Sequence, residues 1–285
     1  MNRAPPSSRT VAELLATARA ELPDPREAVL LVAHALGLSR EALYAHPEQP
    51  VTSADREQAL ALVTARAAGQ PVAYLAGRRE FHGLALEVGP AVLIPRPETE
   101  LLVELALGRL KEISSPTVAD LGTGSGAIAL ALARERPDAS VTATDQSKAA
   151  LSVAGRNARR LGIDNVCFLQ SNWLAPFAAA SFDLVVSNPP YVAAGDPYLE
   201  QGDLRFEPSE ALASGPDGLD AIRRIAADAR RCLKPGGSLM LEHGADQQPA
   251  VCALLAEHGY IGIETHRDLA GLPRAVTCNS SGAMA

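Results

Sequence analysis

From residue 117 onward, short apolar segments alternate with segments that have the apolar spacing of amphipathic helices. The first five apolar segments have the length of buried strands and lie at Thr117–Leu121, Ser140–Thr144, Val166–Gln170, Phe182–Ser187 and Ser238–Glu242. The helical segments between them lie at Ala127–Arg134, Lys148–Leu161 and Leu219–Leu233. This alternation predicts an α/β fold with a doubly wound, mostly parallel sheet. In such a sheet, ligands bind at the carboxyl ends of the strands.

Two further apolar segments, Ile261–Thr265 and Ala275–Cys278, bring the expected number of strands to seven. The sequence between these two segments shows no helical pattern. Consecutive strands without a crossover helix pair antiparallel, so we expect them to form a hairpin at the end of the sheet.

The first part of the chain has helical patterns only. Apolar residues recur at helical spacing over residues 11–22, 26–36, 40–45 and 53–68. Ser53 is the expected N-cap of the last of these helices. Over residues 79–94 the pattern changes to that of a β-hairpin, and a further helix is expected at Pro97–Lys111. We therefore expect a helical bundle domain over residues 1–78, a β-hairpin linker over 79–96 and a catalytic domain over 97–285.

A glycine-rich loop follows the first expected strand and begins at Asp120. Its candidate cofactor-binding residues are Gly122, Thr123, Gly124, Ser125 and Gly126. Glycines permit positive φ and close approach of a ligand, and the helix that follows offers free N–H groups. The next strand ends near Asp145, which follows Gly124 by 21 residues and can bind both hydroxyls of a ribose. The sequence therefore predicts a cofactor that contains adenosine.

The tetrapeptide Asn188-Pro189-Pro190-Tyr191 follows the fourth expected strand. The loop is stiff, because proline fixes φ near about −65° and has no N–H to continue a strand ladder. We expect the Asn188 side-chain oxygen and the Pro189 carbonyl to accept the two hydrogens of a planar NH2 group, with the Tyr191 ring packed on its face. The loop alone leaves glutamine, asparagine, adenine and cytosine as acceptors.

The net charge and the cysteine and histidine content limit which partners and ligands we expect. The net charge of −7 is not that of a protein that binds duplex nucleic acid, so we expect no direct nucleic-acid partner. The four cysteines include no C-x-x-C pair and the six histidines show no metal-ligand spacing, so no disulfide framework and no metal site are expected. No stretch is long and charge-free enough to span a bilayer. We expect a cytoplasmic protein without a membrane partner.

Several motifs resemble, in the same order along the chain, those of the peptide chain release factor N5-glutamine methyltransferases, the PrmC/HemK family. They are Phe81-His82-Gly83, Leu93-Ile94-Pro95-Arg96-Pro97-Glu98-Thr99-Glu100, the glycine loop, Asn188-Pro189-Pro190-Tyr191, Arg205-Phe206-Glu207-Pro208 and Gly215-Pro216-Asp217-Gly218-Leu219. The resemblance covers nearly the whole chain. It implies a class I methyltransferase fold, S-adenosylmethionine as the cofactor and S-adenosylhomocysteine as its product.

The same resemblance implies that the partner and substrate is a class 1 peptide chain release factor, methylated on the glutamine amide of its Gly-Gly-Gln loop. It also implies that Asp120 lies near the methionine amino group and that Trp173 borders the adenine. Phe81, Arg96 and Pro190 are expected to contact the substrate together with the other residues of the tetrapeptide. We expect the helical domain to dock the substrate and the protein to act as a monomer.

Three other functions remain open on the sequence. A glutamine methyltransferase that acts on a ribosomal protein shares most of these motifs. An adenine-N6 methyltransferase would also hold a planar NH2 group, although it needs a basic face and a way to extract a base from the stack. A nucleotide-dependent oxidoreductase would use the same glycine loop and Asp145, but it leaves the tetrapeptide unexplained.

Overall fold

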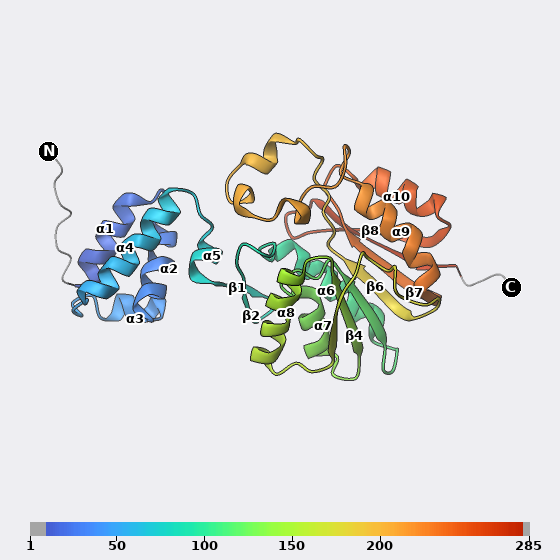
Figure 1. Ribbon diagram of the computed structural model, residues 1–285, viewed down its shortest axis with the longest axis horizontal. Coiled ribbons are helices and arrows are strands. Elements are labelled where there is room, and N and C mark those ends of the chain that lie inside the picture. The colour runs from blue at the N-terminus through green and yellow to red at the C-terminus, as the bar shows by residue number, and fades with distance from the viewer. Residues whose placement is uncertain (1–9, 282–285) are drawn as a thin grey trace. The chain divides into compact units, whose positions relative to one another are not determined.

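The computed structural model describes residues 10–281. Backbone contacts divide the chain into two compact units, residues 1–77 and 78–285 (Figure 1). The division falls one residue before the expected boundary, because Arg78 already pairs with Glu87 in a strand ladder. Among the described residues, no helix combines the length and the apolar character needed to cross a membrane.

Within its described residues the first unit has five helices and one isolated bridge between Thr10 and Pro50. Its helices are α1 (Val11–Glu21), α2 (Pro25–Leu36), α3 (Arg40–Ala45), α4 (Ser53–Ala67) and α5 (Val72–Ala76). Thr10 and Glu13 form a capping box at the start of α1. Thr52 caps α4 by accepting a hydrogen bond from the Asp55 amide at 3.1 Å, so the predicted N-cap at Ser53 was wrong by one residue. The apolar faces of α1, α2 and α4 share one core, which confirms the predicted helical bundle.

The second unit opens with an antiparallel hairpin, β1 (Arg78–Phe81) and β2 (Leu84–Glu87). His82 and Gly83 form its two-residue turn with φ values of 47° and 69°, the conformation that short hairpin turns require. Pairing stops at Glu87, earlier than expected, and residues 88–96 continue without a strand. The short 3-10 turn η1 (Pro97–Thr99) and helix α6 (Glu100–Leu110) follow.

The main sheet of the second unit has seven strands. They are β3 (Thr117–Leu121), β4 (Ser140–Asp145), β5 (Val166–Gln170), β6 (Phe182–Ser187), β7 (Leu233–Glu242), β8 (Tyr260–Arg267) and β9 (Pro273–Ser280). Their order is β5-β4-β3-β6-β7-β9-β8. All neighbours from β5 to β7 are parallel, and β9 is antiparallel to both β7 and β8. This confirms the predicted doubly wound sheet. The switch point between β3 and β6 is where such sheets bind ligands.

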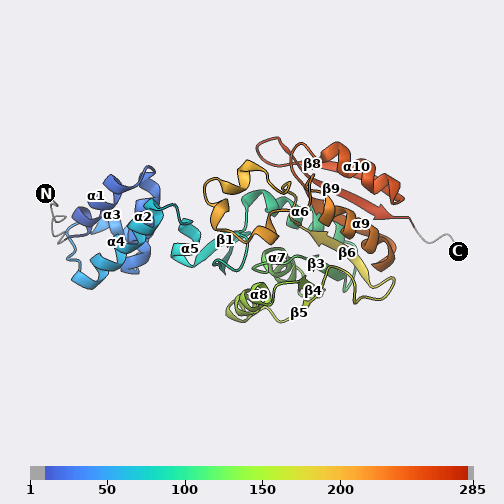
Figure 2. The same cartoon turned by 45° about the horizontal axis from the view of Figure 1, so that its top comes forward.

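Helices cover both faces of the sheet (Figures 1 and 2). Helices α6, α7 (Ala127–Glu135) and α8 (Lys148–Leu161) pack on one face. Helices α9 (Asp220–Cys232) and α10 (Gln248–Glu257) pack on the other. Between β6 and α9 the chain forms three 3-10 turns, η2 (Pro197–Glu200), η3 (Leu204–Phe206) and η4 (Ser209–Ala211).

Helix α10 is absent from the sequence-based expectation. Its N-cap residue Gln247 is not a usual capping residue and makes no side-chain capping bond, although Pro249 in the first turn is a helix-start signal. Its buried residues Val251, Leu254 and Leu255 have the i, i+3, i+4 spacing of a helix, so the sequence does carry a helical pattern for α10.

Two neighbouring leucines of α2 test the core of the first unit. Leu31 is fully buried, whereas Leu30 is 41% exposed. Leu31→Ala should lower the free energy of unfolding of this unit by about 2–5 kcal/mol, because it removes buried methyl groups and leaves a cavity. Leu30→Ala is the matched control and should cost less than about 1 kcal/mol. Amide hydrogen exchange in α1, α2 and α4 measures the free energy of unfolding of each variant. Equal effects of the two substitutions would contradict this packing.

Candidate active site

Two cavities lie at the carboxyl ends of the central strands. The glycine-loop cavity, of about 540 Å³, is lined by Gly122 and Gly124, by Asp145 and by Trp173, among others. The Arg96 cavity, of about 550 Å³, is lined among others by Arg96, Tyr191, Glu242 and Arg274. Asn188, Leu93 and Ala211 line both cavities. The expected cofactor-binding and substrate-binding groups therefore meet at Asn188.

Two features determine the conformation of the glycine loop. Its three glycines adopt left-handed backbone conformations, and the carboxylate of Asp145 binds its backbone. Gly122, Gly124 and Gly126 have φ values of 68°, 56° and 86°, which residues with a side chain adopt only with strain. Asp145 accepts hydrogen bonds from the amides of Gly124 at 3.0 Å and Ser147 at 2.8 Å. The end of β4 thus holds the loop that follows β3.

Four of the predicted cofactor-binding residues, Asp120, Thr123, Ser125 and Gly126, are not among the residues that line the cavity. A side chain at Gly126 would place its Cβ 3.0 Å from Leu130 Cδ1, so this glycine allows α7 to pack closely. The Thr123 hydroxyl donates to Asp120 Oδ2 at 2.6 Å, and the Ser125 carbonyl accepts from the Asn157 side-chain Nδ2 at 2.9 Å. These residues shape the loop through packing and hydrogen bonds.

Asp120 is a buried carboxylate with an unused oxygen. It is 1% exposed, and its Oδ2 accepts from Thr123 and from the Ala129 amide. Its Oδ1 has no hydrogen-bond partner in the described part of the chain. Burial raises the pKa of Asp120 to about 7. Asp120 lines neither cavity, and its unpartnered oxygen is a buried acceptor at the start of the glycine loop.

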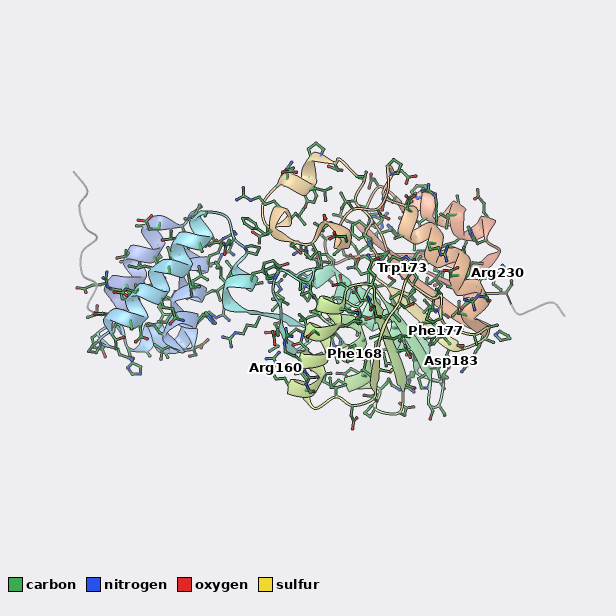
Figure 3. The ribbon with its side chains drawn as sticks, in the orientation of Figure 1. Arg160, Phe168, Trp173, Phe177, Asp183 and Arg230 are labelled. Atoms are coloured by element: carbon green, nitrogen blue, oxygen red, sulfur yellow. The ribbon has the colours of Figure 1, made fainter. Side chains whose placement is uncertain are left out.

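Trp173 follows β5 and has a φ of 52°. Its ring carbon Cζ3 lies 3.5 Å from the position that a Cβ atom on Gly122 would occupy, so the ring packs over the glycine loop. Figure 3 labels Trp173 and Phe177 on the connection between β5 and β6, and both pack against the core under α9 and α10. The indole thus forms one wall of the glycine-loop cavity, where an adenine ring can stack.

Asn188 belongs to a chain of hydrogen bonds that ends on Glu242. The Asn188 Nδ2 donates to Thr99 Oγ1 at 2.9 Å, and the Thr99 hydroxyl donates to Glu242 Oε2 at 2.7 Å. The Tyr191 hydroxyl donates to Glu242 Oε1 at 3.1 Å. Burial raises the pKa of Glu242 to about 7, and burial also raises the pKa of the Tyr191 phenol. Both polar side chains of the tetrapeptide are therefore tied, directly or through Thr99, to one buried carboxylate.

The two prolines of the tetrapeptide face different cavities. Pro189 lines the Arg96 cavity, and Pro190 lines the glycine-loop cavity. The predicted contact of Pro190 with substrate is therefore less well supported by position than that of Pro189.

Sequence reasoning missed Thr99 and Glu242 as members of the site. Glu242 carried a usable signal, because it ends the apolar run Leu239–Leu241 at the close of a strand, as Asn188 does for β6. Thr99 lies inside the run that carried the family resemblance, but its hydroxyl had no partner that could be identified from sequence.

Of two other residues predicted to contact substrate, Arg96 lines a cavity and Phe81 lies in the core. Arg96 lines the Arg96 cavity and forms an ion pair with the buried Glu207, which also accepts from the Ile94 amide at 3.0 Å. Phe81 is 1% exposed and packs in the core beside α6 and α7, and it lines neither cavity. The predicted contact of Phe81 with substrate was therefore wrong, since the hairpin turns this ring inward.

No group of three or more histidine, cysteine, aspartate or glutamate residues within residues 10–281 is arranged to hold a metal ion. The site presents instead acceptor oxygens, an aromatic wall and a polar cavity. Such a set can hold an adenosine compound on one side and a planar NH2 group on the other.

Two family models match parts of this chain. Residues 8–77 match the family described as the PrmC N-terminal domain, and residues 98–201 match the Methyltransferase small domain. Among solved structures, a methyltransferase from Pyrococcus furiosus is similar with a TM-score of 0.51 and 18% identity, covering 78% of this chain and 98% of its own. The ribosomal protein L11 methylase of Lactobacillus delbrueckii subsp. bulgaricus has a TM-score of 0.50 and 22% identity, covering 68% and 84%. These two likenesses show the fold.

Curated relatives are much closer in sequence. The chain is 52% identical over 282 residues to the release factor glutamine methyltransferase of Burkholderia pseudomallei, with 96% of this chain and 98% of the relative covered. It is 47% identical over 243 residues to the release factor glutamine methyltransferase of Escherichia coli, with 85% and 87% covered. The chain therefore belongs to the release factor glutamine methyltransferase family.

Proposed function

We propose that this protein transfers a methyl group from S-adenosylmethionine to the side-chain amide nitrogen of the glutamine in the Gly-Gly-Gln motif of class 1 release factors. The observation that carries the proposal is the position of Asn188, which lines both the glycine-loop cavity and the Arg96 cavity. The names of the curated relatives support a release factor as the protein substrate.

S-adenosylmethionine is the cofactor of the family, and when bound it supplies a methyl group activated by a sulfonium centre. In this proposal, Asp120 pairs with its ammonium group, Asp145 binds the ribose hydroxyls and Trp173 stacks on the adenine. The lining of the glycine-loop cavity by Asp145 and Trp173 supports these roles, and so does the unused oxygen of Asp120. Gly122 and Gly124 leave room for the ligand beside the backbone.

The glutamine amide needs orientation more than deprotonation. Its nitrogen is a poor nucleophile because the lone pair is delocalised into the carbonyl, and its proton is too weakly acidic for a side chain to remove. Asn188 Oδ1 and the Pro189 carbonyl accept the two amide hydrogens and so direct the nitrogen. Tyr191 packs against the amide plane and excludes water. Fixed orientation of this kind can supply effective molarities of about 10⁵ M or more.

The Arg96 cavity receives the segment that carries the glutamine. Arg96 and Arg274 offer donors to its backbone carbonyls, and Glu98 and Asp203 line the same cavity. We propose that the helical unit docks the body of the release factor, and that the protein acts as a monomer in the cytoplasm. The match of residues 8–77 to a domain of this family supports a dedicated role for the helical unit.

The substrate assignment is tested by labelling. The protein is incubated with methyl-labelled S-adenosylmethionine and, separately, with a release factor, the same factor with Ala in place of the Gly-Gly-Gln glutamine, a ribosomal protein and DNA. We expect label in the intact release factor only. Label in the ribosomal protein or in DNA, without label in the release factor, would refute the proposed substrate.

Asn188→Ala tests the acceptor site. We expect the kcat for release factor methylation to fall about 10²–10³-fold, because one preorganised acceptor is lost. The Kd for S-adenosylmethionine should change less than about 3-fold, because one hydrogen bond makes only a small net contribution to binding. The control is Asp145→Asn, which should raise that Kd about 10-fold or more and leave kcat at saturating cofactor close to wild type. Near-normal turnover of Asn188→Ala would show that Asn188 does not orient the amide.

Cofactor affinity should depend on pH through Asp120. The apo carboxyl has a pKa of about 7, and only its charged form attracts an ammonium group. Between pH 5.5 and 7 the association constant should therefore rise with pH, by up to about 10-fold per unit. Isothermal titration calorimetry measures this, and Asp120→Asn should flatten the profile at weaker binding. A wild-type affinity that is constant over this range would exclude the proposed role of Asp120.

A further inference from the structure

The hydroxyl of Thr99 has unusual hydrogen-bond partners for an N-cap residue. Thr99 is the N-cap of α6, a position at which threonine normally accepts a hydrogen bond from a backbone amide of the first turn. Here it makes no such capping bond. Its hydroxyl instead donates to Glu242 and accepts from the Asn188 side chain. The Thr99 hydroxyl thus makes two hydrogen bonds with residues far away in sequence and none with the backbone of its own helix.

The direction of these hydrogen bonds determines how the Asn188 amide is turned. In its ionised form Glu242 can only accept hydrogen bonds, and the Thr99 hydroxyl has one proton to donate. Because the Thr99 proton goes to Glu242, only a lone pair of Thr99 faces Asn188. Asn188 must then present its NH2 group to Thr99, and the opposite end of the amide is the oxygen. The orientation of the asparagine follows from the network.

Burial makes this arrangement rigid. Thr99 is 4% exposed and Glu242 is 1% exposed, so water does not compete for their hydrogen bonds. Tyr191 occupies the second oxygen of Glu242. The charged groups that act on Glu242 include Arg274 on β9 and Glu98 on η1, and both line the Arg96 cavity with it. A buried carboxylate costs stability unless its partners satisfy it, so its two donors are integral to the site.

We propose that Glu242 and Thr99 are positioning residues, which hold the Asn188 side-chain oxygen toward the substrate amide. The inference rests on the proposed function, in which that oxygen accepts an amide hydrogen. Neither residue needs to touch the glutamine. Without the Thr99 hydroxyl, nothing in the hydrogen bonds described for Asn188 distinguishes the two orientations of its amide, and a turned asparagine would present NH2 to NH2.

Thr99→Val and Thr99→Ser form the matched pair that tests this. Valine keeps the shape and removes the hydroxyl, whereas serine keeps the hydroxyl. With the release factor as substrate, Thr99→Val should lower kcat about 10–100-fold, the loss expected for a hydrogen bond to a charged group and its dependent contact. Its KM for S-adenosylmethionine should stay within about 2-fold, and Thr99→Ser should recover kcat to within about 3-fold of wild type.

Glu242→Gln gives a second, independent measurement. Glutamine cannot accept from both Thr99 and Tyr191 with its two ends, so kcat should fall about 10-fold or more while the cofactor KM is kept. In a ¹H–¹⁵N spectrum, the Asn188 side-chain NH2 signals should be protected from solvent exchange in wild type and in Thr99→Ser and unprotected in Thr99→Val.

The outcomes separate this inference from the proposed function. An inactive wild-type protein would refute the proposed function itself. An active wild type together with a Thr99→Val protein of normal kcat would overturn the positioning role alone. A Thr99→Ser protein as impaired as Thr99→Val would also overturn it, because shape rather than the hydroxyl would then matter.

Discussion

The parallel pairing of β3 with β6 aligns four strand ends that carry groups of the site. Leu121 pairs with Ser187, and the Ser187 hydroxyl donates to the Leu121 carbonyl at 2.7 Å. In the same row, Thr144 of β4 pairs with Leu121, and Leu241 of β7 pairs with Ser187. The residues that follow this row are Asp145, Gly122, Asn188 and Glu242. Four strands thus end at one level and present a carboxylate, a glycine turn, an amide and a second carboxylate side by side.

Two of these strand ends carry a buried carboxylate whose pKa is raised to about 7, Asp120 beside the glycine loop and Glu242 at the end of β7. Burying such groups is unfavourable for the folded protein. The two buried carboxylates differ in how their hydrogen-bonding needs are met. Glu242 is satisfied within the protein by Thr99 and Tyr191, whereas one oxygen of Asp120 has no hydrogen-bond partner among the described residues. In the proposed function, Glu242 serves the acceptor side of the reaction and Asp120 serves the cofactor side.

The sequence was sufficient for the sheet, because each central strand is an apolar run that ends at a polar or glycine residue. The positions of Asp145 and Asn188 at strand ends follow from that pattern. The positions of Phe81 and Thr99 were not predictable in this way. The inward turn of Phe81 depends on which hairpin face packs on α6 and α7, and the partner of Thr99 is 143 residues away. Contacts between distant segments leave no periodic signal in the chain.

In the proposed function, the side-chain oxygen of Asn188, which lines both cavities, orients the glutamine nitrogen. The most direct measurement is a crystal structure of the protein with S-adenosylhomocysteine and a peptide that contains Gly-Gly-Gln. We predict that the glutamine amide nitrogen lies about 3 Å from both Asn188 Oδ1 and the Pro189 carbonyl oxygen, with Asn188 Nδ2 still on Thr99. A glutamine amide bound away from these two oxygens, or an Asn188 that turns its Nδ2 toward the peptide, would contradict the account.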